Sequence, residues 1–308
     1  MNSYSKVYIW MTKVMSVYKK LGISNINGLK GTTYRLFSKI ANFDYLYNNN
    51  QHLSTIIDNS NTIVTLTTYG DRTRTVYRTL DSIFHQSVRP YKVILWLSDN
   101  EYTVDNLPNT LIKRMQLYPF FEVRFCKDLK SHKKYYETLK LYPNNSFITA
   151  DDDVFYPFDW LETLLSLSKD NPGMICCTNA HLMNVKYGRI ESYNTWERLT
   201  DMEGPSLYLC PVGIGGVLYP PFSLYKDVLN VECIIKTCIN ADDLWLRIMG
   251  ILNKTSVVKS NKYPYSFLSV NGTQKNALSK TNVLKNKNDI QLMNILELYE
   301  DDVEEILK

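Results

Sequence analysis

Short β-branched runs alternate with longer amphipathic stretches through the middle of the chain. Residues 62–68 (TIVTLTT) predict a strand, and residues 71–84 carry apolar positions at helical spacing. The alternation continues with strands predicted over 92–97, 121–125 and 146–149, and helices over 111–117 and 131–141, the last capped by Ser131. This order is typical of an α/β fold with a mainly parallel sheet flanked by helices. Ligands of such sheets gather at the carboxyl ends of the strands.

The first 50 residues have a different character. They contain seven Lys or Arg residues and one acidic residue, Asp44, so this stretch carries a charge of +6 whereas the whole chain carries +4. An apolar helical face, flanked by Lys6, Lys13 and Lys20, is formed by Val7, Trp10, Met11, Val14, Tyr18 and Leu21. Two interpretations stay open at this point. The face lies on an anionic membrane, or it packs on the rest of the protein.

Composition limits the compartment and the partners. Six cysteines have no CxxC pair and no zinc-like spacing, which predicts reduced core residues in a cytosolic protein. No apolar run is long enough for a signal-peptide core or a membrane span. A basic arm on a slightly acidic body does not indicate a nucleic-acid-binding protein. We therefore expect a cytoplasmic protein, with peripheral attachment to the inner face of the cytoplasmic membrane as the open alternative.

Three regions are predicted from these patterns. Residues 1–58 form the basic helical arm, residues 59–260 the catalytic domain, and residues 261–308 a lid and C-terminal helix. Nothing in the middle of the chain resembles a linker, so a single catalytic domain with appendages is expected. Asn288 and Asp289 are the candidate caps of the final helix.

An acidic triplet follows the last of these predicted strands. Asp151, Asp152 and Asp153 precede a turn at Pro157. Adjacent carboxylates beside a buried strand repel one another and require a cation or strong donors. Magnesium and manganese bind one or two carboxylates together with phosphate oxygens, so the triplet predicts a site for a metal and a diphosphate. The alternative is a solvated acidic loop.

Two later segments add candidate chemistry. Asp242 and Asp243 stand at a predicted helix start, where carboxylates are favourable as caps as well as catalytic groups. Gly213, Gly215 and Gly216 predict a strand that passes close to a sugar or to another strand. The spacing of these glycines is not that of a dinucleotide-binding loop, and no helix follows them.

Taken in order, six segments between residue 62 and about residue 255 resemble bacterial glycosyltransferases of the GT-A fold, close to family two. Singly each motif is weak, but their arrangement is specific. The segments are TIVTLTTYGDR (62–72), SIFHQSVRPYKVILWLSD (82–99), SHKKYYETLKLYP (131–143), TADDDVFYP (149–157), GIGGVLYPP (213–221) and ADDLWL (241–246).

The resemblance implies roles on the donor side. Asp151 and Asp153 would form the DxD motif, the first facing the ribose or sugar and the second a Mn²⁺ or Mg²⁺ ion. Independently of the resemblance, Lys134 lies near the start of a predicted helix, where a lysine could reach the diphosphate, although surface lysines are more often solvated. For Asp99 a simple turn role in the sequence SDN is as plausible. The residues that would hold the nucleotide donor are Thr67, Tyr69, Arg72, Asp99, Lys134, Asp151 and Asp152.

On the acceptor side, the resemblance implies that an acidic pair supplies the general base of an inverting reaction. The family's usual Glu-Asp is Asp-Asp here, which leaves the choice between Asp242 and Asp243 open on the residues; the resemblance favours Asp243. Trp196 would stack on the acceptor, or be an ordinary buried tryptophan. Gly215 and Gly216 would lie beside the acceptor.

The function implied is transfer of a hexosyl or N-acetylhexosaminyl group from a nucleotide-diphosphate sugar, with UDP favoured, to a glycan or lipid-linked glycan of a bacterial surface polysaccharide or lipooligosaccharide. Two rivals remain. A nucleotidyltransferase would need an early glycine-rich, basic loop for a triphosphate, which this chain lacks. A catalytically silent glycan-binding protein would keep the fold without turnover.

Overall fold

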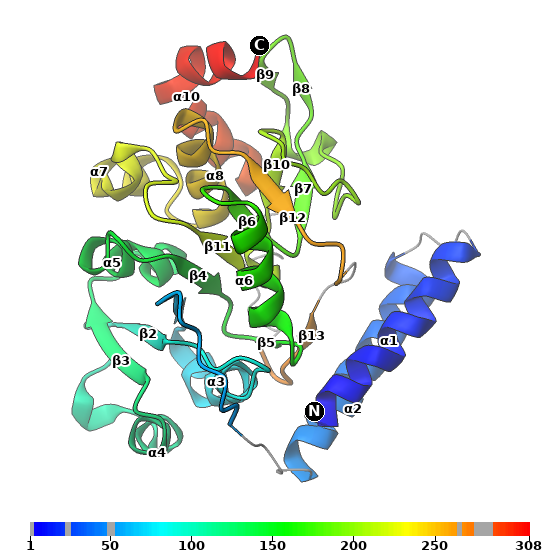
Figure 1. The fold of residues 1–308 in the computed structure, drawn as a ribbon. Coiled ribbons are helices and arrows are strands. Elements are labelled where there is room, and N and C mark those ends of the chain that lie inside the picture. The colour runs from blue at the N-terminus through cyan, green and yellow to red at the C-terminus, as the bar shows by residue number, and fades with distance from the viewer. Residues whose placement is uncertain (1–2, 22–25, 48–52, 264–266, 274–285) are drawn as a thin grey trace.

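A seven-stranded sheet forms the centre of the protein (Figure 1). The computed structural model describes residues 3–21, 26–47, 53–263, 267–273 and 286–308. Neighbouring strands are parallel except β11, which runs antiparallel between β4 and β6. From edge to edge the strands are β12 (Val257–Lys259), β6 (Ile175–Cys177), β11 (Val217–Tyr219), β4 (Phe147–Ala150), β1 (Ile63–Thr67), β2 (Lys92–Ser98) and β3 (Phe121–Cys126).

Helices cover both faces of this sheet. Side chains alternate along β1, so Val64 and Leu66 join one buried cluster and Ile63 the other. The first cluster includes α3 (Val76–Phe84), α4 (Asn109–Leu117) and α6 (Trp160–Asp170). The second includes α5 (Lys133–Leu141), α7 (Val231–Thr237), α8 (Asp242–Leu252) and α10 (Lys287–Leu307). The predicted α/β class, a mainly parallel Rossmann-like sheet flanked by helices, is confirmed.

Short elements connect and extend these layers. Among the described residues, three two-stranded pairs lie outside the main sheet: β5 (Val154–Phe155) with β13 (Leu268–Ser269), β7 (Ala180–Leu182) with β10 (Leu209–Pro211), and β8 (Val185–Lys186) with β9 (Arg189–Ile190). The 3₁₀ turns are η2 (Gly70–Arg74), η3 (Val104–Asn106), η4 (Lys130–His132), η5 (Tyr193–Thr195), η6 (Gly213–Gly215) and η7 (Lys226–Leu229).

The N-terminal arm is a helical hairpin of α1 (Ser3–Lys20) and α2 (Gly31–Tyr47), joined through the π-helical turn η1 (Ile26–Lys30) and placed beside the body (Figure 1). Its packing on the body is extensive. Val7 and Met11 are buried, and the hydroxyl of Tyr8 accepts a hydrogen bond from the amide of Leu268 at 2.7 Å. The packing interpretation is therefore correct for this part of the face. Trp10 and Leu21, which belong to the same predicted face, are exposed instead.

Several local predictions differ from the structure. Ser131 lies inside η4 and does not cap α5, because the chain makes a 3₁₀ turn before the helix. The glycine segment forms η6, and the strand begins only at Val217. Asn286 occupies the N-cap position of α10, so neither Asn288 nor Asp289 caps this helix. The predicted lid falls partly on residues 264–266 and 274–285, which lie outside the described residues.

Two sequence-level expectations concern chemistry and membranes. All six cysteines are free thiols, and all except Cys233 are buried, as a reduced core requires. Among the helices that the structure describes, none combines the length and the apolar character needed to cross a bilayer.

Gly216 is a position where the fold requires glycine. Its φ is +79°, and an added Cβ would lie 2.4 Å from the ring of Trp160. Gly173 has the same φ but open space around it. We predict that Gly173→Ala lowers the free energy of unfolding by about 1 kcal/mol through backbone strain alone, whereas Gly216→Ala costs about 1–3 kcal/mol more, because overpacking is added. Urea unfolding of both variants tests this, and equal losses would contradict it.

Candidate active site

One cavity of about 480 Å³ opens at the carboxyl edge of β1 and β4. The chain after these two strands, the start of α5 and the start of α8 meet here, and β11, being antiparallel, brings its preceding glycine turn to the same edge. The edge expected to bind ligands is therefore hollow. Predicted residues that line the cavity are Thr67, Tyr69, Arg72, Lys134, Asp151, Asp152, Asp153, Asp242 and Asp243.

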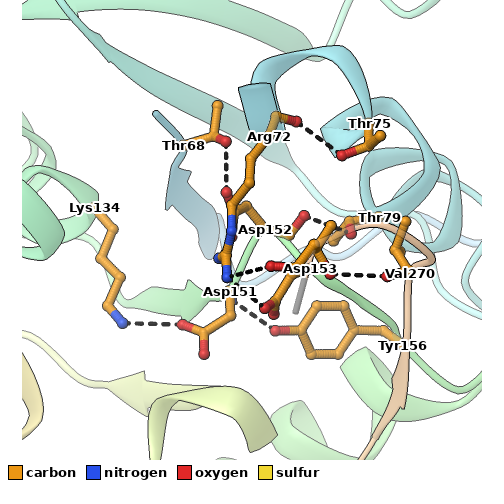
Figure 2. A network of polar contacts seen from close by, with 11 residues as sticks. Thr68, Arg72, Thr75, Thr79, Lys134, Asp151, Asp152, Asp153, Tyr156 and Val270 are labelled. Carbon is orange, nitrogen blue, oxygen red and sulfur yellow. Dashed lines mark hydrogen bonds and ion pairs between the residues drawn. The ribbon is translucent and has the colours of Figure 1, made fainter. Parts of the chain in front are cut away.

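The acidic triplet is neutralised in part by Arg72, which η2 places over it (Figure 2). The guanidinium contacts a carboxylate oxygen of Asp152 at 2.7 Å and of Asp153 at 3.1 Å. Thr68 donates a further hydrogen bond to Asp152 at 2.5 Å. Burial nevertheless raises the pKa of Asp152 above its ordinary value, because these contacts only partly replace water. Arg72 is thus a structural counter-ion as well as a residue of the cavity wall.

Asp151 is the most accessible carboxylate of the triplet. Its side chain is 32% exposed, against 6% for Asp152. Its backbone amide donates to the hydroxyl of Tyr156 at 2.8 Å, which holds the start of the loop in place. Lys134 approaches its carboxylate at 3.2 Å (Figure 2). This carboxylate faces the cavity with capacity for another ligand.

Lys134 connects the triplet to the second acidic pair. Its ammonium group is buried and lies 2.7 Å from Asp242 as well as 3.2 Å from Asp151. Burial alone would lower the pKa of Lys134, but the charges of Asp151 and Asp242 outweigh it, and the pKa lies well above the ordinary lysine value. The lysine is therefore fixed and charged. The alternative of a solvated surface lysine is excluded by this burial.

Asp242 and Asp243 are adjacent but have opposite properties. Burial would raise the pKa of Asp242, yet Lys134 outweighs it and holds that pKa below the ordinary value. For Asp243, burial and the charge of Asp242 raise the pKa to about 7. Its carboxylate accepts a hydrogen bond from the amide of Gly213 at 3.0 Å. Two neighbouring carboxyl groups with pKa values driven apart are an arrangement suited to proton transfer near neutral pH.

Gly213 makes this arrangement possible. An added Cβ would lie 2.9 Å from a carboxylate oxygen of Asp243 and 3.0 Å from the ammonium nitrogen of Lys134. The glycine thus leaves space for an ion cluster. Gly215 and Gly216, by contrast, do not line the cavity, because they pack closely on Asn179 and Trp160. Neither glycine contributes to the wall of this cavity, and their place beside an acceptor stays a prediction.

Two further predicted residues lie elsewhere. Asp99 is exposed outside the cavity and stands in a turn, in which the amide of Tyr102 donates to the carbonyl of Ser98 at 2.9 Å, in agreement with the turn interpretation. Trp196 is buried, donates from Nε1 to the carbonyl of Glu191 at 2.9 Å, and packs on Tyr193. Tyr193 itself lines the cavity. Trp196 therefore packs behind Tyr193 and does not itself line the cavity.

Sequence reasoning missed several cavity residues. Asp128 follows β3 at the carboxyl edge of the sheet, and the rule used for β1 and β4 identifies that position as well. It lies 2.5 Å from Lys133, and although burial opposes ionisation, Lys130 and Lys133 hold the pKa of Asp128 at about 2. No periodic signal marks the others. They include Glu101, His181, Tyr193, Asn240 and Asn288.

His181 is a neutral group of the cavity wall. Burial and the nearby charge of Arg198 lower the pKa of this imidazole to about 4. The backbone amide of Leu199 donates to its Nδ1 at 3.0 Å. An uncharged, fixed ring of this kind offers shape and hydrogen bonding instead of charge.

Comparison with known proteins leaves the class of reaction open. No protein-family model matches the chain, and no curated protein is significantly similar to it in sequence. A solved structure titled "Crystal structure of 4-diphosphocytidyl-2C-methyl-D-erythritol synthase" is similar over 78% of this chain and 100% of its own, with 8% identity and a TM-score of 0.39. A likeness this distant carries no argument about the reaction, so function must be argued from the site.

The Arg72 contacts generate a stability prediction. Arg72→Gln leaves Asp152 buried without its counter-ion, which should cost about 3 kcal/mol of unfolding free energy. The pKa of Asp152 is already raised in the folded state, and the substitution raises it further. Protonation therefore relieves the loss at low pH, and the loss should be larger at pH 8 than at pH 5.

Urea unfolding at the two pH values measures this effect. Arg189→Gln is the matched control, because Arg189 pairs with Glu304 on the surface and its loss should leave the unfolding midpoint essentially unchanged. A pH-independent loss for Arg72→Gln would show that the ion pair is not the cause.

Proposed function

We propose that the protein is a metal-dependent glycosyltransferase that moves a sugar from a nucleotide-diphosphate donor to a glycan acceptor with inversion. The single observation that carries the proposal is that both acidic groups, the triplet at 151–153 and the pair at 242–243, line one cavity and are joined by Lys134. A transferase of this class needs a charged site for the leaving diphosphate beside a base for the acceptor hydroxyl. The sequence resemblance to family-two glycosyltransferases is the initial reason for considering this class of enzyme.

The donor half of the proposal assigns Asp151 and Asp153 to a divalent cation. Their oxygen ligands fit Mg²⁺ or Mn²⁺, and the accessible carboxylate of Asp151 has room for one. Within the described part of the chain no cluster of three or more acidic, histidine or cysteine ligands surrounds a common point, so phosphate oxygens and water would complete the shell. When bound, the cation would neutralise charge on the departing diphosphate.

Lys134 adds a fixed positive charge to this half. Because its ammonium group stays ionised between Asp151 and Asp242, it offers electrostatic stabilisation without rearrangement as the diphosphate leaves. Thr67, at the end of β1, and Tyr69, which follows it, line the same cavity and are the candidates for contact with the nucleoside. The favoured donor is a UDP-linked hexose or N-acetylhexosamine.

The acceptor half assigns the general base to Asp243. A carboxyl with a pKa of about 7 is partly ionised at neutral pH and is a stronger base than an ordinary aspartate. The amide of Gly213 orients it, and Asp242, held ionised by Lys134, raises its basicity. Tyr193 and His181 form the neighbouring wall, where a glycan or lipid-linked glycan of a bacterial surface polymer would lie.

A nucleotidyltransferase is the main rival. The turn that follows β1 contains a single glycine, Gly70, and its Arg72 is committed to Asp152 and Asp153. A loop that wraps a triphosphate normally offers several glycines and free cations. Product analysis separates the classes, because a nucleotidyltransferase releases pyrophosphate and a glycosyltransferase releases a nucleoside diphosphate. A silent glycan-binding protein would release neither.

The donor assignment is tested by a thermal-shift screen of sugar nucleotides with and without Mn²⁺. A ligand that binds only the folded state raises Tm, and the increase should require the metal. We predict that Asp153→Asn loses the manganese-dependent part of donor binding in calorimetry while keeping the fold. The exposed Asp99→Asn is the control, since Asp99 lies outside the cavity. Metal-independent binding that survives chelation and the Asp153 substitution would refute the assignment.

The base assignment predicts a separation of binding from chemistry. Asp243→Asn should bind donor and Mn²⁺ normally yet transfer sugar roughly 10²- to 10⁴-fold more slowly, because a positioned base is lost. The measurement is turnover at saturating donor. If Asp243→Asn keeps near-normal turnover and Asp242→Asn does not, the role belongs to Asp242.

The pH profile gives an independent check. The base must be deprotonated, so kcat/KM should rise with pH through a limb near pH 7, the pKa of Asp243. Because the charge of Asp242 raises that pKa, Asp242→Asn should move the limb to lower pH. A limb that stays in place in Asp242→Asn would mean that another group controls the rate.

A further inference from the structure

The α1–α2 hairpin has a solvent-facing side that the sequence pattern did not identify. Residues at successive three- and four-residue steps lie on one face of a helix. On α1 such a row consists of Lys6, Trp10, Lys13, Val17 and Lys20, and every member is exposed. Basic and apolar side chains therefore alternate along the outer side of this helix.

The apolar members are large and open to solvent. Trp10 is 60% exposed and Val17 is 51% exposed. The second helix repeats the pattern, with Lys39 between the exposed side chains of Leu36 and Phe43. Single exposed apolar residues are common on proteins, but ordered rows interleaved with lysines are characteristic of helices that lie at a membrane surface.

The opposite side of the hairpin fixes its placement. Val7 and Met11 belong to the buried cluster that includes Leu268 of the body, and the hydroxyl of Tyr8 accepts a hydrogen bond from the amide of Leu268. Asn42 of α2 accepts from the amide of Asn271 at 2.8 Å and donates to the carbonyl of Ser269 at 2.8 Å. The row Lys6, Trp10, Lys13, Val17 and Lys20 of α1 is therefore presented to the surroundings by a hairpin that is held on the body.

We propose that the outer side of the hairpin, defined by the row Lys6, Trp10, Lys13, Val17 and Lys20, docks on an anionic lipid surface. Charge decides the occupant: α1 contains no acidic residue and residues 1–50 carry +6. Symmetric pairing with a second copy would bring these lysines together, whereas acidic headgroups attract them. Trp10 and Val17 would enter the interfacial region while the lysines remain among the headgroups.

Flotation of the full-length protein with vesicles tests the proposal. Binding is expected to vesicles of equal parts phosphatidylglycerol and phosphatidylcholine, to be weaker on pure phosphatidylcholine, and to fall as salt rises. Trp10→Ser with Val17→Ser should weaken binding about tenfold or more, because two apolar side chains no longer leave water. Lys13→Glu with Lys20→Glu should weaken it at least about tenfold through charge.

Controls keep the outcome interpretable. Ile235→Ser with Met293→Ser removes two apolar side chains from helices of the body, each 58% exposed and so comparable to Trp10 and Val17. Lys236→Glu reverses one charge on the body. Neither control should alter vesicle binding. Unchanged Tm in every variant shows that the fold survives, whereas deletion of residues 1–22 would remove buried side chains. The proposal would be overturned if the full-length protein does not float with the vesicles, or if the variant with Trp10→Ser and Val17→Ser binds them as well as the unsubstituted protein does. A concentration-dependent dimer that this variant abolishes would also overturn it.

Discussion

The ammonium group of Lys134 is the contact on which the architecture of the cavity depends. It stands between the acidic triplet that follows β4 and the acidic pair that begins α8, and both groups are largely removed from water. Without a cation between them, three carboxylates from two separate elements would repel one another across a weakly screened space. One buried lysine allows the edge of a parallel sheet and the start of a distant helix to approach, and Gly213 supplies the room for that approach.

The same balance gives neighbouring carboxyl groups different properties. Asp242 makes the direct contact with Lys134 and stays ionised. Burial and the negative charge of Asp242 then raise the pKa of the neighbouring Asp243 to about 7. Arg72 performs a comparable task for Asp152 and Asp153. These two cations thus hold a dense set of carboxylates in place while leaving Asp151 accessible, and this division of contacts connects the fold to the proposed reaction.

Much of this arrangement is determined by short segments of the chain and could therefore be predicted from the sequence. The β-branched runs at 62–68 and 92–97 form β1 and β2, and the acidic triplet lies where a parallel sheet binds ligands. The failures concern long-range packing. Trp196 and Gly216 are residue types compatible with a sugar site. Only the folded structure shows that Trp196 packs on Tyr193 and that Gly216 lies against Trp160. Asp99 follows a strand, yet its turn directs it away from the cavity.

The attachment of the hairpin has a consequence for synthesis of the chain. Tyr8 and Asn42 bond Leu268, Ser269 and Asn271, and Ser269 pairs with Val154, the residue after the acidic triplet. Helices α1 and α2 therefore leave the ribosome more than 200 residues before these partners and must wait for them. The sheet strands up to β4 can pair earlier, but the loop that carries Asp151 to Asp153 gains its full support only after residues 268–271 have emerged.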